Sequence, residues 1–151
     1  MATGRAFPLV IVVAVGTAVL VDAARRWYQR FLARRFRQAH GGKDLLIVYT
    51  DSPHWKEYIE SRWVNQWRER TVTLNRSRPW SRKQPEAALW LGVAGIAEHT
   101  PLAVVVPRKG KFRVIRFFAA FRDFKHGKDA RLRDAEVELE NAMESAASTG
   151  A

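Results

Sequence analysis

The chain of 151 residues contains no cysteine. Disulfide bonds, thiolate metal sites and thiol redox chemistry are therefore excluded. The Gly-x-Gly-x-x-Gly and Walker phosphate loops are also missing, as is the Gly-x-Ser-x-Gly motif of serine hydrolases. The sequence thus lacks the motifs that mark nucleotide-binding proteins, serine hydrolases and disulfide oxidoreductases.

Histidine is scarce as well. The chain has four: His40, His54, His99 and His126. None of them has the spacing of a metal-ligand pair, either with another histidine or with a carboxylate. We therefore predict that the protein holds no metal and no cofactor.

Acidic residues are outnumbered by basic ones, 15 to 26, so the net charge is +11 and the isoelectric point about 10.8. Such a charge favours anionic partners: lipid headgroups, nucleic acid or acidic protein faces. The acids gather near the C-terminus, in residues 129–151, and the N-terminal residues 1–43 are strongly basic. The two ends of the chain are therefore expected to have different surroundings.

Long apolar runs are few, and the longest uncharged one covers residues 6–21. One arginine, Arg5, precedes this run, whereas six arginines follow it between residues 25 and 37. The positive-inside rule then predicts a single-pass transmembrane anchor over residues 1–24. The anchor would lie in a bacterial inner membrane, with the N-terminus outside and the C-terminal domain in the cytoplasm. A cleaved signal peptide and a buried core helix are the competing interpretations.

Residues 25–43 are predicted to form a basic amphipathic helix that ends in a hinge at Gly41 and Gly42. At 100° per residue, aromatic side chains fall on one side of this helix and arginines on the other. We expect the helix to meet an anionic leaflet. The predicted membrane-interface residues are Arg25, Arg26, Trp27, Tyr28, Arg30, Arg34 and Arg37.

Residues 44–143 are predicted to form the soluble domain, followed by a flexible tail over 144–151. The pattern indicates strand, helix, strand, helix, strand, strand and helix, with Ser52 as the first helix's N-cap and Pro53 as its first residue. Strands separated by helices should be parallel, and the hairpin across Gly110 should be antiparallel. The predicted fold class is therefore α/β: a transmembrane helix followed by a four-stranded mixed sheet with packed helices.

This order resembles the thioredoxin-like fold. Thr100-Pro101 stands directly before the third strand, where that family has its cis-proline, and Asp51-Ser52-Pro53-His54 stands where the family has Cys-x-x-Cys. The resemblance implies a thioredoxin-like domain over residues 44–143. Because neither end of that stretch carries sulfur, the implied domain is redox-inactive.

Asp51 and His54 are expected near Thr100-Pro101. A carboxylate beside a neutral histidine could act as an acid or base, or this corner could bind a thiol ligand. The plainer interpretation is that Asp51 or Ser52 caps the helix and that His54 is solvated.

Two surfaces are predicted to bind a partner, because aromatic side chains beside arginine are favoured at protein interfaces. The predicted partner-binding residues are Phe117, Phe118, Phe121, Arg122 and Phe124 in one surface, and Arg76, Arg78, Trp80 and Arg82 in the other. The second surface could also face nucleic acid or an anionic membrane.

The sequence therefore predicts a protein that is not an enzyme. Its predicted role is that of an accessory or assembly subunit of a larger membrane complex, such as a respiratory, photosynthetic or transport complex. Its partners would be the membrane and the other subunits. One alternative is an enzyme or thiol-ligand binder using the corner of Asp51, His54 and Pro101. Another is a membrane-proximal nucleic-acid binder. Nucleic-acid and small-molecule partners are disfavoured.

Overall fold

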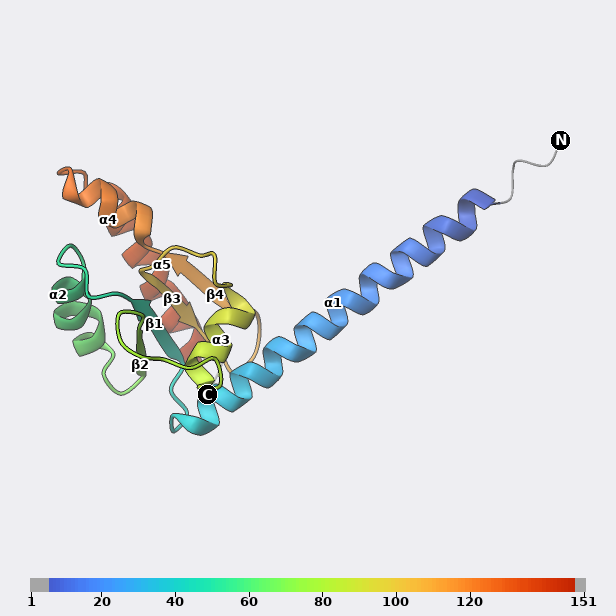
Figure 1. Cartoon of the computed structure of the whole chain (residues 1–151), viewed down its shortest axis with the longest axis horizontal. Coiled ribbons are helices and arrows are strands. Elements are labelled where there is room, and N and C mark those ends of the chain that lie inside the picture. Colours follow the sequence, from blue (N-terminus) through green and yellow to red (C-terminus); the bar gives the residue numbers. More distant parts are fainter. Residues whose placement is uncertain (1–5, 149–151) are drawn as a thin grey trace.

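The protein is described by a computed structural model, which describes the backbone of residues 6–148 and the side chains of residues 19–148. A long helix projects from an α/β domain in which helices cover both faces of one sheet (Figure 1). The elements in chain order are α1 (Ala6–Ala39), β1 (Leu45–Tyr49), α2 (Lys56–Tyr58), the π-helical η1 (Ile59–Val64), β2 (Thr71–Asn75), α3 (Pro85–Val93), β3 (Leu102–Val105), β4 (Arg113–Arg116), α4 (Phe118–Lys125) and α5 (Ala130–Ser148).

The sheet has the order β2-β1-β3-β4, so β1 and β3 are central. Every residue of these two strands is buried, as the unbroken apolar runs predict for strands covered on both faces. Alternate side chains point to opposite faces and form two cores. Leu45 and Ile47 face η1, α4 and α5, whereas Leu46 and Val48 face α3 and the C-terminal part of α1.

The strand directions differ from the prediction in one respect. β1 and β2 are parallel and β3 and β4 antiparallel, as expected, but β3 runs antiparallel to β1 instead of parallel. The reason is that the loop over residues 76–84, and not helix α3, returns the chain to the amino ends of β1 and β2. Glu86, in the first turn of α3, contacts His40, just ahead of β1. Helix α3 therefore runs in the same direction as β1, and β3, which follows α3, returns in the opposite direction.

The helices also differ from the prediction. Ser52 and Pro53 do not begin the first helix, because the backbone makes a turn there in which the Lys56 N–H donates to the Ser52 carbonyl. The helix begins at Lys56 and continues as η1. A separate helix, α4, follows β4, and α5 extends through Ser148 over most of the predicted tail. The rest of that tail, residues 149–151, lies outside the described residues.

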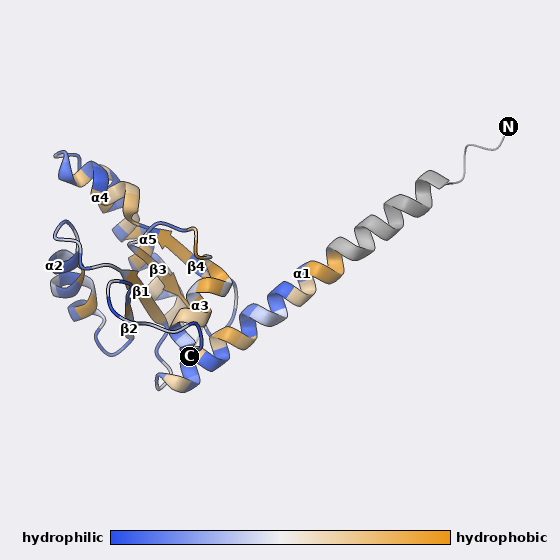
Figure 2. Ribbon diagram, viewed as in Figure 1, coloured by the Kyte–Doolittle hydropathy of each residue, from blue (hydrophilic) through white to orange (hydrophobic). Residues whose placement is uncertain are grey.

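The predicted transmembrane helix is corrected by the structure. In the part of the chain that the structure describes, no helix combines the length and the apolarity needed to cross a membrane. Within the uncharged run over residues 6–21, only the side chains of Val19, Leu20 and Val21 are described. Beyond them, charged and apolar residues alternate along α1 (Figure 2). The membrane-spanning, single-pass description is therefore wrong for the described chain.

Candidate interaction site

Helix α1 has two segments with different surroundings. Residues 28–39, the docked segment, lie against the domain, whereas residues 19–27, the free segment, project away from it (Figure 1). Leu32, Ala33 and Phe36 of the docked segment are buried in one of the two cores. The helix is continuous through both segments. The domain and the projecting free segment are therefore joined without an intervening loop.

A glycine on α3 allows the docked segment to approach closely. A Cβ atom at Gly92 would collide with Leu32 Cδ1 and lie 3.3 Å from Tyr28 Cε1. The two helices therefore pack with almost no space between Gly92 and the side chains of α1. At the end of α1, the imidazole of His40 lies 3.0 Å from a carboxylate oxygen of Glu86. The predicted turn at Gly41 and Gly42 is present, but the helix before it is fixed to α3.

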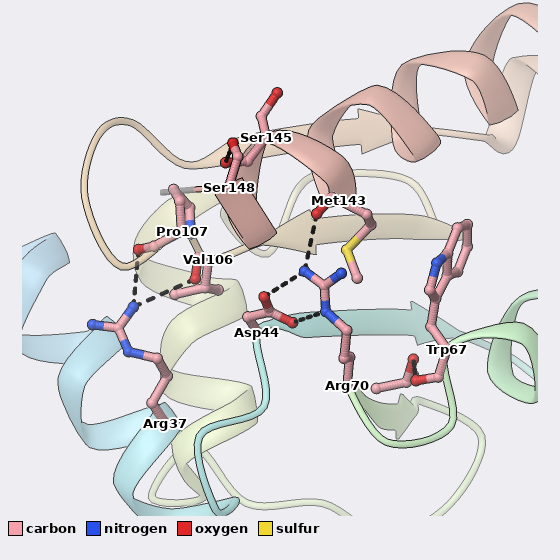
Figure 3. Close-up of polar contacts among 10 residues, drawn as sticks. Arg37, Asp44, Trp67, Arg70, Val106, Pro107, Met143, Ser145 and Ser148 are labelled. Atoms are coloured by element: carbon pink, nitrogen blue, oxygen red, sulfur yellow. Dashed lines mark hydrogen bonds and ion pairs between the residues drawn. The ribbon is translucent and has the colours of Figure 1, made fainter. Parts of the chain in front are cut away.

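Arginines bind backbone carbonyls and a carboxylate near the end of α1 (Figure 3). Arg37 Nη1 donates to the carbonyl oxygens of Val106 at 3.4 Å and Pro107 at 2.9 Å. Arg70, just before β2, binds both carboxylate oxygens of Asp44 and donates to the Met143 carbonyl of α5. Burial, and then the neighbouring Arg108, lower the pKa of Arg37 from its ordinary value. Arg37 therefore fixes the end of α1 to the chain that follows β3, and Arg70 joins the beginnings of β1 and β2 to α5.

Some of the predicted membrane-interface residues contact the domain, and the others are exposed. Arg37 is part of the contacts just described, and Tyr28 packs near Gly92. Arg26 pairs with Asp22 one turn earlier, with 2.8 Å between nitrogen and oxygen. The other predicted cations, Arg25, Arg30 and Arg34, are exposed, and none makes an ion pair within the described chain. The cationic surface of α1 is therefore largely available to a partner.

Large apolar side chains stand in solvent along the free segment of α1 and at Phe31, on the outward side of the docked segment. Trp27 is 68% exposed and stacks on Phe31, with 6.2 Å between the ring centroids. Leu20 and Ala24 precede Trp27 by seven and three positions, so the four side chains form one stripe along the helix. We call Leu20, Ala24, Trp27 and Phe31 the apolar stripe. Exposed apolar surface of this extent beside cations is typical of a binding surface.

The predicted aromatic surface around α4 is mostly core. Phe117 and Phe121 are buried, and the rings of Trp63 and Tyr58 cover them. This corrects the prediction that both residues contact a partner. Phe118 is half-buried, with its ring stacked on that of His99. Only Phe124, at 42% exposure, and the exposed Arg122 remain on the surface.

The second predicted surface, the loop over residues 76–84, partly folds against the domain. The guanidinium of Arg76 lies 4.8 Å from the ring centroid of Trp90, and Trp80 makes an edge contact with the same ring. These contacts cover the buried Trp90. Arg78 and Arg82 remain exposed. Trp80, the one aromatic side chain predicted for this surface, therefore packs partly against the domain.

The corner of Asp51, His54 and Pro101 does not form an acid–base pair. Asp51 binds Lys56 Nζ at 2.9 Å and accepts a hydrogen bond from Asn75 Nδ2 at 2.7 Å. Hydrogen bonds from Lys56 and then Asn75 lower the pKa of Asp51. His54 is exposed, and the peptide bond before the buried Pro101 is cis. Asp51 does not cap α2 either, which has no side-chain cap.

A buried carboxylate on α5 escaped the sequence analysis. Glu136 is 9% exposed, and its Oε1 accepts hydrogen bonds from Tyr58 Oη at 2.8 Å and Trp63 Nε1 at 2.9 Å. Burial, with the bond to Glu136, raises the pKa of Tyr58 to about 12. Glu136 lies on the buried side of α5, between Leu132 and Leu139. A charged residue at that position is the sequence signal that could have identified it. Its contacts connect α5 to both α2 and η1 and explain why both aromatic donors face inward.

The described residues contain no cluster of three or more histidines and carboxylates that could hold a metal ion. Comparison of the chain with protein-family models, with curated protein sequences and with solved structures finds no match. The assignment of function therefore rests on the geometry of the surfaces described above.

Proposed function

We propose that this protein is a non-catalytic accessory or assembly subunit of a larger protein complex, and that the free segment of α1 is its main docking surface. The observation that carries the proposal is the exposure of the stacked Trp27–Phe31 pair on a helix whose other end is fixed into the domain. An amphipathic helix of this kind binds by laying its apolar side into a groove of its partner.

The charge of α1 indicates the chemistry of the partner. Exposed arginines flank the apolar stripe, and one acid, Asp22, is already paired with Arg26. The partner is therefore a protein that offers an apolar groove with acidic residues at its rim. Tryptophan and arginine are enriched among the residues that dominate binding energy at protein interfaces, which favours a protein over a lipid surface as the occupant.

The thioredoxin-like resemblance of the domain stays a prediction. The parallel pair β1 and β2, the antiparallel pair β3 and β4 and the position of Pro101 before β3 support it. The absence of cysteine from the sequence rules out thiol exchange in such a domain. The enzyme alternative loses its support, since Asp51 is bound to Lys56 and Asn75 and not to His54.

The proposal is tested by co-purification of the tagged full chain from its own cells in mild detergent. Trp27→Glu together with Phe31→Glu should abolish recovery of the partner while the yield and melting temperature of the chain stay unchanged. Ile96→Glu is the matched control, because Ile96 is an exposed apolar residue outside α1. A different outcome would overturn the proposal in favour of a lipid surface. In that outcome the unmodified chain recovers no protein partner but binds anionic lipid vesicles, and the double variant loses the vesicle binding.

A further inference from the structure

A hollow lies on the surface between the β3–β4 hairpin and α5. Its volume is about 790 Å³. Val105, Phe112 and Ala142 give it apolar side chains, and Val137 stands 54% exposed at its side. Lys109, Lys111 and Arg113 come from the hairpin, and Asp134 and Glu138 from α5. We call this hollow the hairpin groove. No residue of α1 lines it, although Pro107, whose carbonyl binds Arg37, lies at its border.

Strand β4 is an edge strand beside this groove, because the sheet order is β2-β1-β3-β4. The Phe117 N–H donates to the Pro101 carbonyl, so residues 113, 115 and 117 turn their backbone groups toward β3. By alternation, Val114 and Arg116 turn their N–H and C=O groups outward. No loop or second strand of the described chain takes up these groups. The free edge can therefore accept another strand.

The charges of the groove are polarised along its length. Lys109, Lys111 and Arg113 lie at the hairpin end, where β4 begins. Helix α5 runs the opposite way to β4, since its Met143 carbonyl meets Arg70 near the amino ends of β1 and β2. Asp134 and Glu138 therefore lie toward the other end of β4. None of these five charged residues makes an ion pair within the described chain.

We propose that the hairpin groove binds an extended peptide segment of a partner protein, which adds to β4 as an antiparallel strand. Its acidic side chains lie beside Lys109, Lys111 and Arg113, and its basic side chains beside Asp134 and Glu138. Main-chain hydrogen bonds to Val114 and Arg116 supply affinity, and the charges supply direction, as in other cases of strand addition.

A second copy of this chain is the less suitable occupant. Strand β4 carries two arginines and no acidic residue, so a second copy of this strand would bring no carboxylate of its own to the edge beside Lys109, Lys111 and Arg113. Arg116 already binds Glu98, with 2.6 Å between nitrogen and oxygen, whereas Arg113 has no such partner and points its charge at the groove. An acidic strand satisfies Arg113, and a second copy does not.

The test uses the full chain and a probe peptide of sequence Lys-Val-Lys-Val-Thr-Val-Glu-Val-Glu. An antiparallel strand of this sequence places its glutamates at the hairpin end. The controls are the same sequence reversed and the same sequence with its three central residues N-methylated. The probe should bind at least tenfold more tightly than either control. In NMR spectra of the chain, it should shift and protect the amides of Val114 and Arg116.

Charge reversal in the chain tests the polarity independently of folding. Lys109→Glu with Lys111→Glu should weaken probe binding at least tenfold, and adding Glu138→Lys should transfer the preference to the reversed peptide. Arg78→Glu, far from the groove, is the control and should change nothing. Equal binding of the N-methylated peptide, or shifts confined to the loop over residues 76–84, would overturn strand addition. Failure of the probe to bind at all would overturn it as well.

Discussion

The docked and free segments of α1 belong to one helix, yet they differ in everything that surrounds them. In the docked segment, Phe36 is fully buried between α3 and the sheet. In the free segment, Trp27 stands in solvent and stacks on Phe31. A side chain that packs within its own domain contributes to folding, whereas an exposed aromatic of similar size contributes nothing until a partner covers it. The docked segment of the helix therefore stabilises the fold, whereas the free segment is available to bind a partner.

The largest expected effect comes from a matched pair of phenylalanines. Phe36→Ala should cost about 3–5 kcal/mol in the free energy of unfolding, because it leaves a cavity in a closed core. Phe31→Ala, on the outward side of the same segment, should cost less than about 0.5 kcal/mol. Urea unfolding of both variants measures the difference. Similar costs for the two changes would mean that the docked segment has no distinct buried side.

The approach of α1 to α3 gives the next effect. Gly92→Ala should cost about 1–3 kcal/mol, because the added Cβ atom collides with Leu32 Cδ1. Combining Gly92→Ala with Leu32→Ala should cost less than the sum of the two single changes, since the shorter side chain removes the collision. Thermal unfolding of the three variants provides the measurement. Strict additivity would show that the two helices do not meet at this point.

The arginines supply a third pair. Arg37→Ala should cost about 1–2 kcal/mol, because the carbonyls of Val106 and Pro107 lose their donor. Arg34→Ala, one turn earlier and exposed, should leave stability unchanged within about 0.5 kcal/mol. Chemical unfolding of the two variants compares them directly. A larger cost at Arg34 than at Arg37 would reverse the assignment of structural and free cations.

The smallest effect on stability is expected at Trp27 in the apolar stripe. Trp27→Ala should change the free energy of unfolding by less than about 0.5 kcal/mol. The same change should lower the recovery of the partner complex, because a buried tryptophan anchor at an interface typically contributes more than about 2 kcal/mol to binding. Loss of stability with undiminished recovery would place Trp27 in the fold and not in the interface.

The sequence predicts the elements of the domain better than their connections. Unbroken apolar runs identify β1 and β3 because strands buried on both faces need them. The direction of β3 depends on where the loop after Asn75 returns the chain, and that path is determined by contacts such as His40 with Glu86. Such contacts join residues far apart in the sequence, and no local pattern reveals them.

In the candidate site, too, local patterns predict some features and long-range contacts determine the others. The amphipathic pattern places Trp27 and Leu32 on the same apolar side of the helix, whereas in the structure Leu32 is buried in the domain and Trp27 lies in solvent. The aromatic run after β4 could not be assigned by pattern alone. Phe121 is covered by Tyr58 at the end of α2, and the Tyr58 hydroxyl donates a hydrogen bond to Glu136 on α5, a helix far away in the sequence. The sequence signal for this arrangement was the charged Glu136 among the apolar residues on the buried side of α5.

Amide hydrogen exchange along α1, in the isolated chain and in the co-purified complex, tests the central claim most directly. The account predicts slow exchange over residues 28–39 in both samples, because this segment is packed on α3 and the sheet. Over residues 19–27 it predicts fast exchange in the isolated chain and slow exchange in the complex. Fast exchange of both segments in the isolated chain, or an unprotected free segment in the complex, would contradict it.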